Sequence, residues 1–572
     1  MPRRTRPLTA LPRKLWGRAI QLARRLPAVA DLELRHYVAL EARLLHLPAP
    51  DTAKPACPWP LPPAPVLRQA LAATPDYRCI DLRSPGGGDA AWLSSHALKP
   101  AHIAANRGLI PESHLPPQRI ARRRQLGLEP DTDGTAFQLE ALDQAAVEAV
   151  CPVTGRLRRA IHGLLAAQNQ PIFYWFPADG EAPAMLLAAG REGRGWIKLY
   201  LFLPALRTAL LLADATRWHG RDEIDQLRAH LLAEHRAVDA YLRRTDPPRP
   251  WVLLDNRQFA HHLWNALSGL ERLAASCHKG DSTPPAGLLV CAEPWGPPEA
   301  LFPELSAAGI QVERAIFPAP IQAAQREHRL LLRVGGTRMS EALLARVHRL
   351  AAQRVPDAVL ARAAGLRRNH HPILWVTLRM DNRTWVSQVP GLIAIGRRLA
   401  ADYPHAALVI DGFSVPYGPA NAPDAGHARL IAAEQRAATA IAAALAGVLP
   451  VVSLVGRPLF EAVVFTTVAD CCFAHQGSLQ HKIGWLGNCP GVVHANRTVL
   501  TTPMLWEPAL SARVAQTPPT YLDPALVRDV PGAKRVAKNR WMDDLDNYEL
   551  DPDAAYEVLA PLLADGRERG LR

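Results

Sequence analysis

Short apolar runs alternate with helical stretches from Trp251 onward, and this alternation constrains the fold more than any other feature of the chain. A first series runs from WVLLD through the helical FAHHLWNALSGLERLAAS to GLLVCAE and IQVERAIF. A second series contains the strand candidates ILWVTLR, AALVIDG, PVVSLVG, DCCFAH and PGVVHAN, again separated by helical segments. Such alternation is typical of parallel βαβ units. We therefore predict an α/β fold with two Rossmann-like domains, over residues 251–365 and 366–510.

The remaining segments follow other patterns. Residues 1–150 contain helical stretches between long irregular ones, which predicts a helical and irregular N-terminal region. Over residues 151–250, short apolar runs at hairpin-like spacing precede a long helical stretch, which predicts a small antiparallel β subdomain with a linking helix. Residues 511–572 are left as a C-terminal extension.

Composition excludes several classes of protein. With 572 residues, 48% hydrophobic and 21% charged, the chain is long enough to bury several cores without disulfide or metal staples. The eight cysteines contain no C-x-x-C pair, which argues against a disulfide framework or a zinc site. No apolar run approaches the roughly 20 residues that cross a bilayer, and the N-terminus lacks a secretory signal pattern. We expect a cytoplasmic protein.

The net charge of +13 is concentrated at the N-terminus, where eight Lys and Arg residues fall within the first 25 positions. Two interpretations of residues 1–30 stay open. One is an interfacial helix that contacts anionic lipid peripherally at the inner membrane, and the other is a solvated terminal helix. Because the rest of the chain is only mildly basic and carries no nucleic-acid motif, we expect no nucleic-acid partner.

Three segments place polar residues at the ends of predicted strands, where open parallel sheets bind ligands. The first is DCCFAHQGSLQHKIGW. In it Gly477 permits close backbone approach, Ser478 can cap a helix, and the helix start favours an anion. His475, His481 and Lys482 add hydrogen-bond donors. This pattern indicates a diphosphate site, and its alternative is an ordinary turn with a capping serine.

The other two segments suggest a phosphate clamp and a base. In TLRMDNRTW, Arg379 and Arg383 suit bidentate phosphate contacts, although they could equally pair with surface acids. In LLDNRQFAHHLWN, His261 or His262 could act as general base for a sugar hydroxyl, with Asp255 orienting it. A structural histidine is the alternative, and one histidine could pack while the other faces a cleft. No zinc-type spacing or third ligand accompanies the pair.

Together, and in this order, the three segments resemble family 61 glycosyltransferases, the group once described as capsular polysaccharide biosynthesis proteins. The resemblance covers about residues 250–510. The residues that carry it are Gln258, Phe259, Ala260 and His261 in the first signature, Arg379 and Arg383 in the second, and Ala469 to Ser478 in the third, preceded by Glu461.

The chain also departs from the family pattern. Asn265 replaces a carboxylate four residues after the first histidine, and Ser387 and Gln388 replace Asn-Glu. Gln476 stands where the family has His, Ser478 where it has Ala, and His475 is shifted by one position. Two interpretations follow: a distant active subfamily that uses His475 or His481 instead, or a protein that keeps the fold and has lost transfer chemistry.

The resemblance implies two Rossmann domains of GT-B type, with a nucleotide sugar bound mainly by the second, and neither a metal nor a cofactor. It predicts a glycosyltransferase that moves a sugar from a nucleotide diphosphate to a glycan or lipid-linked hydroxyl in polysaccharide biosynthesis. The catalytic set would be His261, His262 and Asp255, and the donor-binding set would be Arg379, Arg383, Glu461, His475, Gln476, Gly477, Ser478, His481 and Lys482. The alternative is a catalytically silent glycan or nucleotide-sugar binding protein.

Overall fold

The computed structural model describes residues 77–82, 86–129, 136–190, 197–212, 220–279, 283–418, 422–502, 507, 510–530 and 546–570. They form two compact units. The first unit contains the described residues up to Leu253 together with Gly280–Leu289 and Glu313–Val334, and the second contains Leu254–Lys279, Val290–Val312 and Gly335–Arg572. The helix predicted within residues 1–30 lies outside the described residues.

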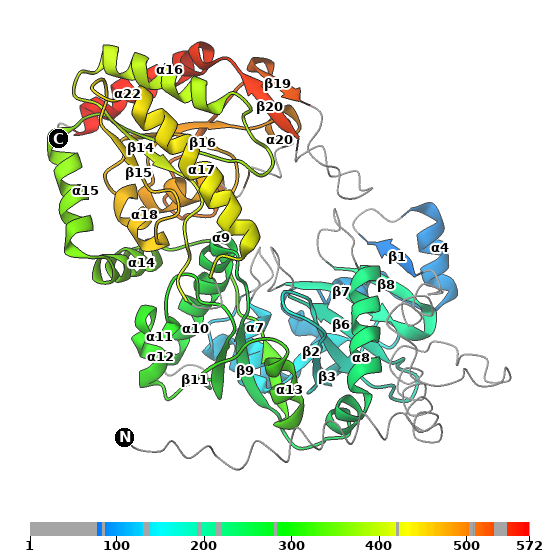
Figure 1. Ribbon diagram of the computed structural model, residues 1–572. Helices are drawn as coiled ribbons and strands as arrows, with labels where there is room; N and C mark the ends of the chain where they lie inside the picture. The colour runs from blue at the N-terminus through cyan, green and yellow to red at the C-terminus, as the bar shows by residue number, and fades with distance from the viewer. Residues whose placement is uncertain are drawn as a thin grey trace, which may run out of the picture. The chain divides into compact units, whose positions relative to one another are not determined.

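The larger sheet of the first unit has the strand order β1-β8-β7-β6-β5-β4. Its strands are β1 (Arg78–Asp81), β4 (Gly163–Leu165), β5 (Ile172–Phe176), β6 (Met185–Ala189), β7 (Lys198–Leu203) and β8 (Thr208–Leu211). Strands β4 to β8 pair antiparallel with their neighbours, whereas β1 joins β8 in parallel. Helix α8 (Gly220–Leu242) lies beside this sheet (Figure 1). Its Ile224, Leu227 and Leu231 join the hydrophobic core that the sheet contributes to. These residues follow the 3.6-residue helical period.

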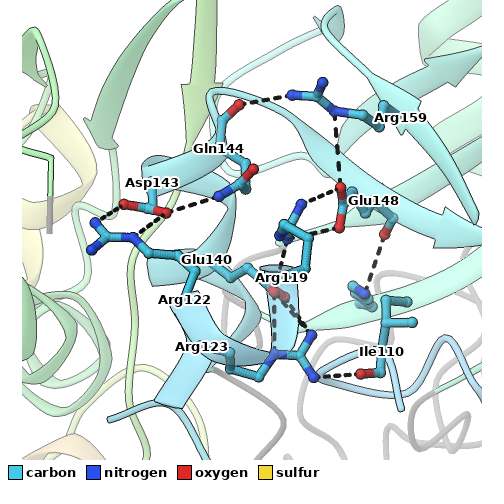
Figure 2. Close-up of polar contacts among 10 residues, drawn as sticks. Ile110, Arg119, Arg122, Arg123, Glu140, Asp143, Gln144, Glu148 and Arg159 are labelled. Atoms are coloured by element: carbon cyan, nitrogen blue, oxygen red, sulfur yellow. Dashed lines mark hydrogen bonds and ion pairs between the residues drawn. The ribbon is translucent and has the colours of Figure 1, made fainter. Parts of the chain in front are cut away.

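A buried ion network holds the shorter elements of the first unit together (Figure 2). It joins α6 (Pro117–Gln125) to α7 (Phe137–Gln144) and β2 (Val147–Val150), which pairs with β3 (Leu157–Ala160). Arg119 donates to both carboxylate oxygens of Glu148, at 2.6 and 2.9 Å, and to Glu140 at 2.9 Å. Arg123 donates to both oxygens of Glu140. Since each carboxylate is met by arginine, neither is left as an uncompensated buried charge.

The strands of the first predicted α/β series form a separate four-stranded sheet with the order β11-β10-β9-β12. They are β9 (Arg249–Leu254), β10 (Gly287–Val290), β11 (Gln311–Arg314) and β12 (Arg329–Leu332). Strands β12 and β9 pair in parallel.

The second unit is built on a six-stranded parallel sheet with the order β15-β14-β13-β16-β17-β18. Its strands are β13 (Ile373–Thr377), β14 (Ala407–Asp411), β15 (Val451–Ser453), β16 (Cys471–His475), β17 (Gly491–His494) and β18 (Thr520–Tyr521). The order reverses between β13 and β16, which is the doubly wound arrangement, and ligands bind such sheets at the reversal. The predicted mixed α/β class with parallel sheets is confirmed.

Both faces of this sheet are apolar, which explains why helices cover both. Leu374 and Val376 of β13 enter a core shared with α16, α17 and α22, whereas Ile373 and Trp375 enter a second core with α15 and α18. The helices are α15 (Asp357–Asn369), α16 (Gln388–Asp402), α17 (Ala425–Ala444), α18 (Leu459–Thr466) and α22 (Pro552–Gly570). Helix α22 packs on α16 although it comes from the predicted extension (Figure 1).

Two helical glycines provide a matched test of this packing. A Cβ at Gly391 on α16 would lie 2.1 Å from the buried ring of Trp385, whereas one at Gly365 on α15 would meet nothing within 4 Å. We expect Gly391→Ala to lower the free energy of unfolding by about 1–3 kcal/mol through overpacking. Gly365→Ala should raise it by about 0.5–1 kcal/mol because alanine favours helix. Urea unfolding of both variants checks the opposite signs, and equal effects would contradict the packing.

Candidate functional site

The carboxyl edge of the parallel sheet brings two of the three predicted segments together at the strand-order reversal. The loop after β13 carries Arg379 and Arg383, and β16 leads into Gln476 and Gly477. The Nη1 atom of Arg383 donates to Oε1 of Gln476 at 3.0 Å. A Cβ added to Gly477 would lie 3.7 Å from Nη1 of Arg379 and 3.8 Å from Nη1 of Arg383. Both guanidinium groups therefore lie beside the backbone of Gly477.

Gly477 has a backbone conformation that other residues avoid, with φ 109° and ψ −149°. It is the N-cap of α19 (Ser478–His481), so the capping residue is the glycine and not Ser478, which follows it half-buried. A side chain here would strain the backbone and approach the arginines. The absence of a side chain at Gly477 therefore leaves space beside its backbone, next to both guanidinium groups.

The arginine loop is held in place by its own polar residues. Asn382 accepts from Nε of Arg379 through its carbonyl at 2.7 Å and from Nη2 through its Oδ1 at 2.8 Å. The side chain of Gln388 bonds both the N–H and the carbonyl of Arg379. Arg379 also pairs with the half-exposed Asp381 at 3.1 Å, as the surface-acid alternative anticipates. Asn382 was missed by sequence reasoning, although its place between the arginines could have signalled it.

Two buried histidines lie next to each other at the ends of β16 and β17. Nδ1 of His475 bonds Oγ1 of Thr377 at 2.9 Å, and Nδ1 of His494 bonds the hydroxyl of Tyr548 at 2.6 Å. Their ring centroids are 4.4 Å apart. Burial lowers the pKa of His494 to about 3, and burial, His494 and Arg379 hold that of His475 well below its usual range. Both rings are therefore neutral, and positive charge at this edge resides on the arginines.

Lys482 has a different place from the one predicted. Its Nζ donates to Oδ1 of Asp411 at 2.8 Å, to Oγ of Ser414 at 2.7 Å and to the carbonyl of Gly412 at 3.2 Å. The side chains of Lys482 and Asp411 are 0% exposed. Because all three ammonium hydrogens meet protein acceptors, Lys482 ties the helical turn after β16 to the end of β14. This geometry suits a positioning residue better than a phosphate ligand.

The third predicted segment places its two histidines differently. His262 is 2% exposed, its Nδ1 bonds the carbonyl of Asn256 at 2.9 Å, and burial lowers its pKa to about 4. Asp255 is also buried, at 3% exposure, and acts on His262 through its charge. His261 is half-buried. Of the two predicted bases, His261 is the more accessible.

Asn265 decides which nitrogen of His261 carries the proton. Its Oδ1 lies 3.1 Å from Nδ1 of His261, and its Nδ2 donates to the carbonyl of Gly336 at 2.8 Å. Since the second bond requires the amide nitrogen on that side, Oδ1 faces the ring and accepts from Nδ1–H. Nε2 of the neutral imidazole is then the basic nitrogen.

His481 connects all three segments. Burial, followed by the electrostatic influence of His261 and Arg383, lowers its pKa to about 3. Its ring stacks on Trp485, with centroids 4.1 Å apart and planes 8° apart. The segments around His261, Arg383 and Gly477, which are far apart in the sequence, therefore converge within the second unit.

Three further observations concern features considered in the sequence. Glu461 forms an ion pair with Arg457 at 2.9 Å on the first turn of α18. In the described part of the chain, no group of three His, Cys, Asp or Glu side chains could hold a metal ion. None of the described helices is long and apolar enough to cross a membrane.

No protein-family model matches the chain, and no curated protein matches it. A family 9 glycosyltransferase from Veillonella parvula is similar over 48% of this chain and 86% of that chain, with 8% identity and a TM-score of 0.27. A UDP-GlcNAc 2-epimerase from Neisseria meningitidis, bound to UDP-GlcNAc, is similar over 50% of this chain and 75% of that chain, with 12% identity and a TM-score of 0.22. Neither similarity assigns an activity to this chain, and the resemblance to family 61 glycosyltransferases remains a prediction.

Glu434 on α17, near the candidate site, makes the stability of the protein depend on pH. Its Oε2 accepts from the backbone N–H of Phe413 at 2.7 Å, and burial raises its pKa to about 7 from a usual 4.5. The folded protein therefore binds this proton more tightly than the unfolded chain. The stabilisation is complete below about pH 4.5 and is lost as the pH rises through about 7.

We expect the free energy of unfolding to fall on the order of 2 kcal/mol more between pH 5 and pH 8 for the wild type than for Glu434→Gln. Glutamine keeps an oxygen for Phe413 N–H but does not titrate. Urea unfolding at the two pH values measures the difference. Parallel pH profiles for the two proteins would refute the assignment of this proton to Glu434.

Proposed function

We propose that the chain is a glycosyltransferase of GT-B type, with residues 251–365 as the acceptor-side domain and residues 366–510 as the nucleotide-sugar domain. One observation carries the proposal: two arginines and a glycine backbone meet where the strand order of a doubly wound sheet reverses, and ring contacts through His481, Trp485 and Trp264 connect that edge to the oriented imidazole of His261. The donor would be a nucleotide diphosphate sugar, and the acceptor a glycan or lipid-linked hydroxyl. The resemblance to family 61 glycosyltransferases supports the same activity.

The arginines would stabilise the leaving group. A diphosphate gains negative charge as its bond to the sugar breaks, and guanidinium groups fixed in advance favour that charge without reorganisation. Asn382 and Gln388 hold the loop, and Arg379 and Arg383 direct Nη1 atoms toward Gly477. Guanidinium groups match the geometry of phosphate oxygens and stay protonated. The backbone of Gly477 and Ser478 would complete the contacts to the diphosphate.

His261 would take the proton of the acceptor. Its Nε2 accepts the proton as the acceptor oxygen bonds the anomeric carbon of the donor sugar. The bond between that carbon and the diphosphate oxygen breaks, and its electron pair leaves with the diphosphate. Asn265 holds the required tautomer. As a neutral amide it stabilises the protonated ring less than the carboxylate of the family pattern would.

The weaker stabilisation of protonated His261 by Asn265 favours the second candidate, a catalytically silent nucleotide-sugar binding protein. In addition, Gln476, which replaces the family's histidine, is engaged by Arg383. Both candidates share the nucleotide site, and they differ in what His261 does.

Nucleotide binding tests the shared part. We expect saturable calorimetric binding of one nucleotide diphosphate from a panel of UDP, GDP, CDP and dTDP, unchanged by EDTA. Arg379→Ala combined with Arg383→Ala should weaken it by about 100-fold, because two charge-assisted hydrogen-bonding groups are lost. The control combines Arg429→Ala with Arg436→Ala, two exposed positions of α17. Absence of binding by folded wild-type protein, or equal losses in both double variants, would contradict the proposal.

Substitution of His261 separates the two candidates. In an enzyme, His261→Ala should lower kcat by about 10²–10⁴-fold and leave the Kd of the nucleotide within about twofold. His262→Ala should lower stability instead, since His262 is buried. Transfer is measured as release of nucleotide in the presence of acceptor, and stability by thermal unfolding. Binding without any wild-type transfer would favour the silent protein.

A further inference from the structure

Four aromatic rings form a continuous cluster around the proposed base. The rings of His261 and Trp264 stack with centroids 5.8 Å apart and planes 23° apart. Trp264 meets Trp485 at 5.8 Å, and Trp485 stacks on His481 at 4.1 Å. Trp485 is buried, whereas His261, Trp264 and His481 are only half-buried. We call these four residues the aromatic platform.

The platform is held rigidly by the segment around Gly336. Nε1 of Trp264 donates to the carbonyl of Thr337 at 2.5 Å, which fixes the plane of the indole. Gly336 donates its N–H to the carbonyl of Asn265 at 3.1 Å, and a Cβ there would lie 2.6 Å from Oγ of Ser268. The same contacts orient His261 through Asn265. Trp264 and Asn265, which both lie on the π-helical turn η3 (His262–Leu267), are therefore fixed by the same segment, and His261 directly precedes this turn.

The part of the platform that can face a ligand is the half-buried pair Trp264 and His261. Nε1 of Trp485 and Nε2 of His481 are buried and have no hydrogen-bond partner among the described residues. A pyranose ring suits the exposed pair, because its axial C–H bonds form an apolar face that can pack on the indole and its hydroxyls lie around the rim, where one can meet the imidazole. An alkyl chain offers no hydroxyl to the imidazole. A nucleobase would stack as well, but the platform includes His261, which the proposed reaction assigns to the acceptor.

We propose that the aromatic platform binds a pyranose ring of the acceptor, so that the acceptor is a sugar and not a lipid or protein hydroxyl. This inference rests on the proposed function. The ring packs against Trp264 and presents one hydroxyl to Nε2 of His261. A free glycan and a lipid-linked sugar share this chemistry.

The test measures sugar binding in the absence of any donor, so that it is independent of nucleotide binding. The probes are methyl pyranosides and disaccharides of the gluco, galacto, manno, rhamno and N-acetylgluco series. Saturation-transfer NMR detects their binding. We expect at least one saturable ligand. Trp264→Leu should weaken it by about tenfold, and Trp264→Phe should retain part of the affinity. Calorimetry should show the Kd of the nucleotide within about twofold of wild type in both variants.

A matched control exists in the first unit, where Trp92 is half-buried and stacks on His96 at 4.1 Å. Trp92→Leu should change neither affinity. Two lipid arms distinguish the sources: a short-chain lipid-linked sugar should bind like the free sugar, and a polyprenyl phosphate without sugar should not depend on Trp264.

Four results would overturn the inference. They are wild-type protein that binds no saccharide, Trp264→Leu protein that binds saccharides normally, loss of nucleotide affinity in place of sugar affinity, and Trp264-dependent binding of sugar-free lipid. Trp264→Phe keeps the test valid if the leucine variant unfolds. Failure of nucleotide binding alone would contradict the proposed function. The saccharide-binding result could still be interpreted, because it is measured without nucleotide.

Discussion

The buried ion pair between Lys482 and Asp411 is the interaction on which the candidate site depends. Taking two charges out of water is costly, and the structure offsets the cost by giving the ammonium group three acceptors. Lys482 directly follows His481 and lies five positions after Gly477. The pair therefore fixes the turn that carries both residues against the end of β14. Removing Lys482 would leave Asp411 buried and unpaired, and would free the turn on which the arginines converge.

Charge at this edge of the sheet is distributed unevenly. Burial keeps His475, His481 and His494 neutral, while Arg379 and Arg383 remain cationic. In dinucleotide-binding folds an acid at this strand end contacts a ribose. Here the corresponding acid, Asp411 at the end of β14, forms an ion pair with Lys482. These features favour an anionic group near Gly477 and disfavour a dinucleotide cofactor in the usual mode.

Sequence patterns could predict the α/β class and the strand-end positions of Arg379, His475 and Gly477, because apolar runs and the polar residues after them are local signals. They could not predict partners, since strand order brings together residues that are distant in the chain. Lys482 lies 71 positions from Asp411, and His494 lies 54 from Tyr548. The predicted C-terminal extension supplies α22 to the core for the same reason. The one local sign of the ion pair with Lys482 was that the strand candidate AALVID ends in an acid, Asp411.

The central claim is that three distant segments form one site for a diphosphate and its sugar. A crystal structure with the nucleotide diphosphate that binds best tests it most directly. We predict phosphate oxygens within hydrogen-bonding distance of Arg379, Arg383 and the N–H of Gly477 or Ser478, with the terminal phosphate on the side of His261. A nucleotide bound elsewhere, with both arginines still engaged as they are in the free protein, would contradict it.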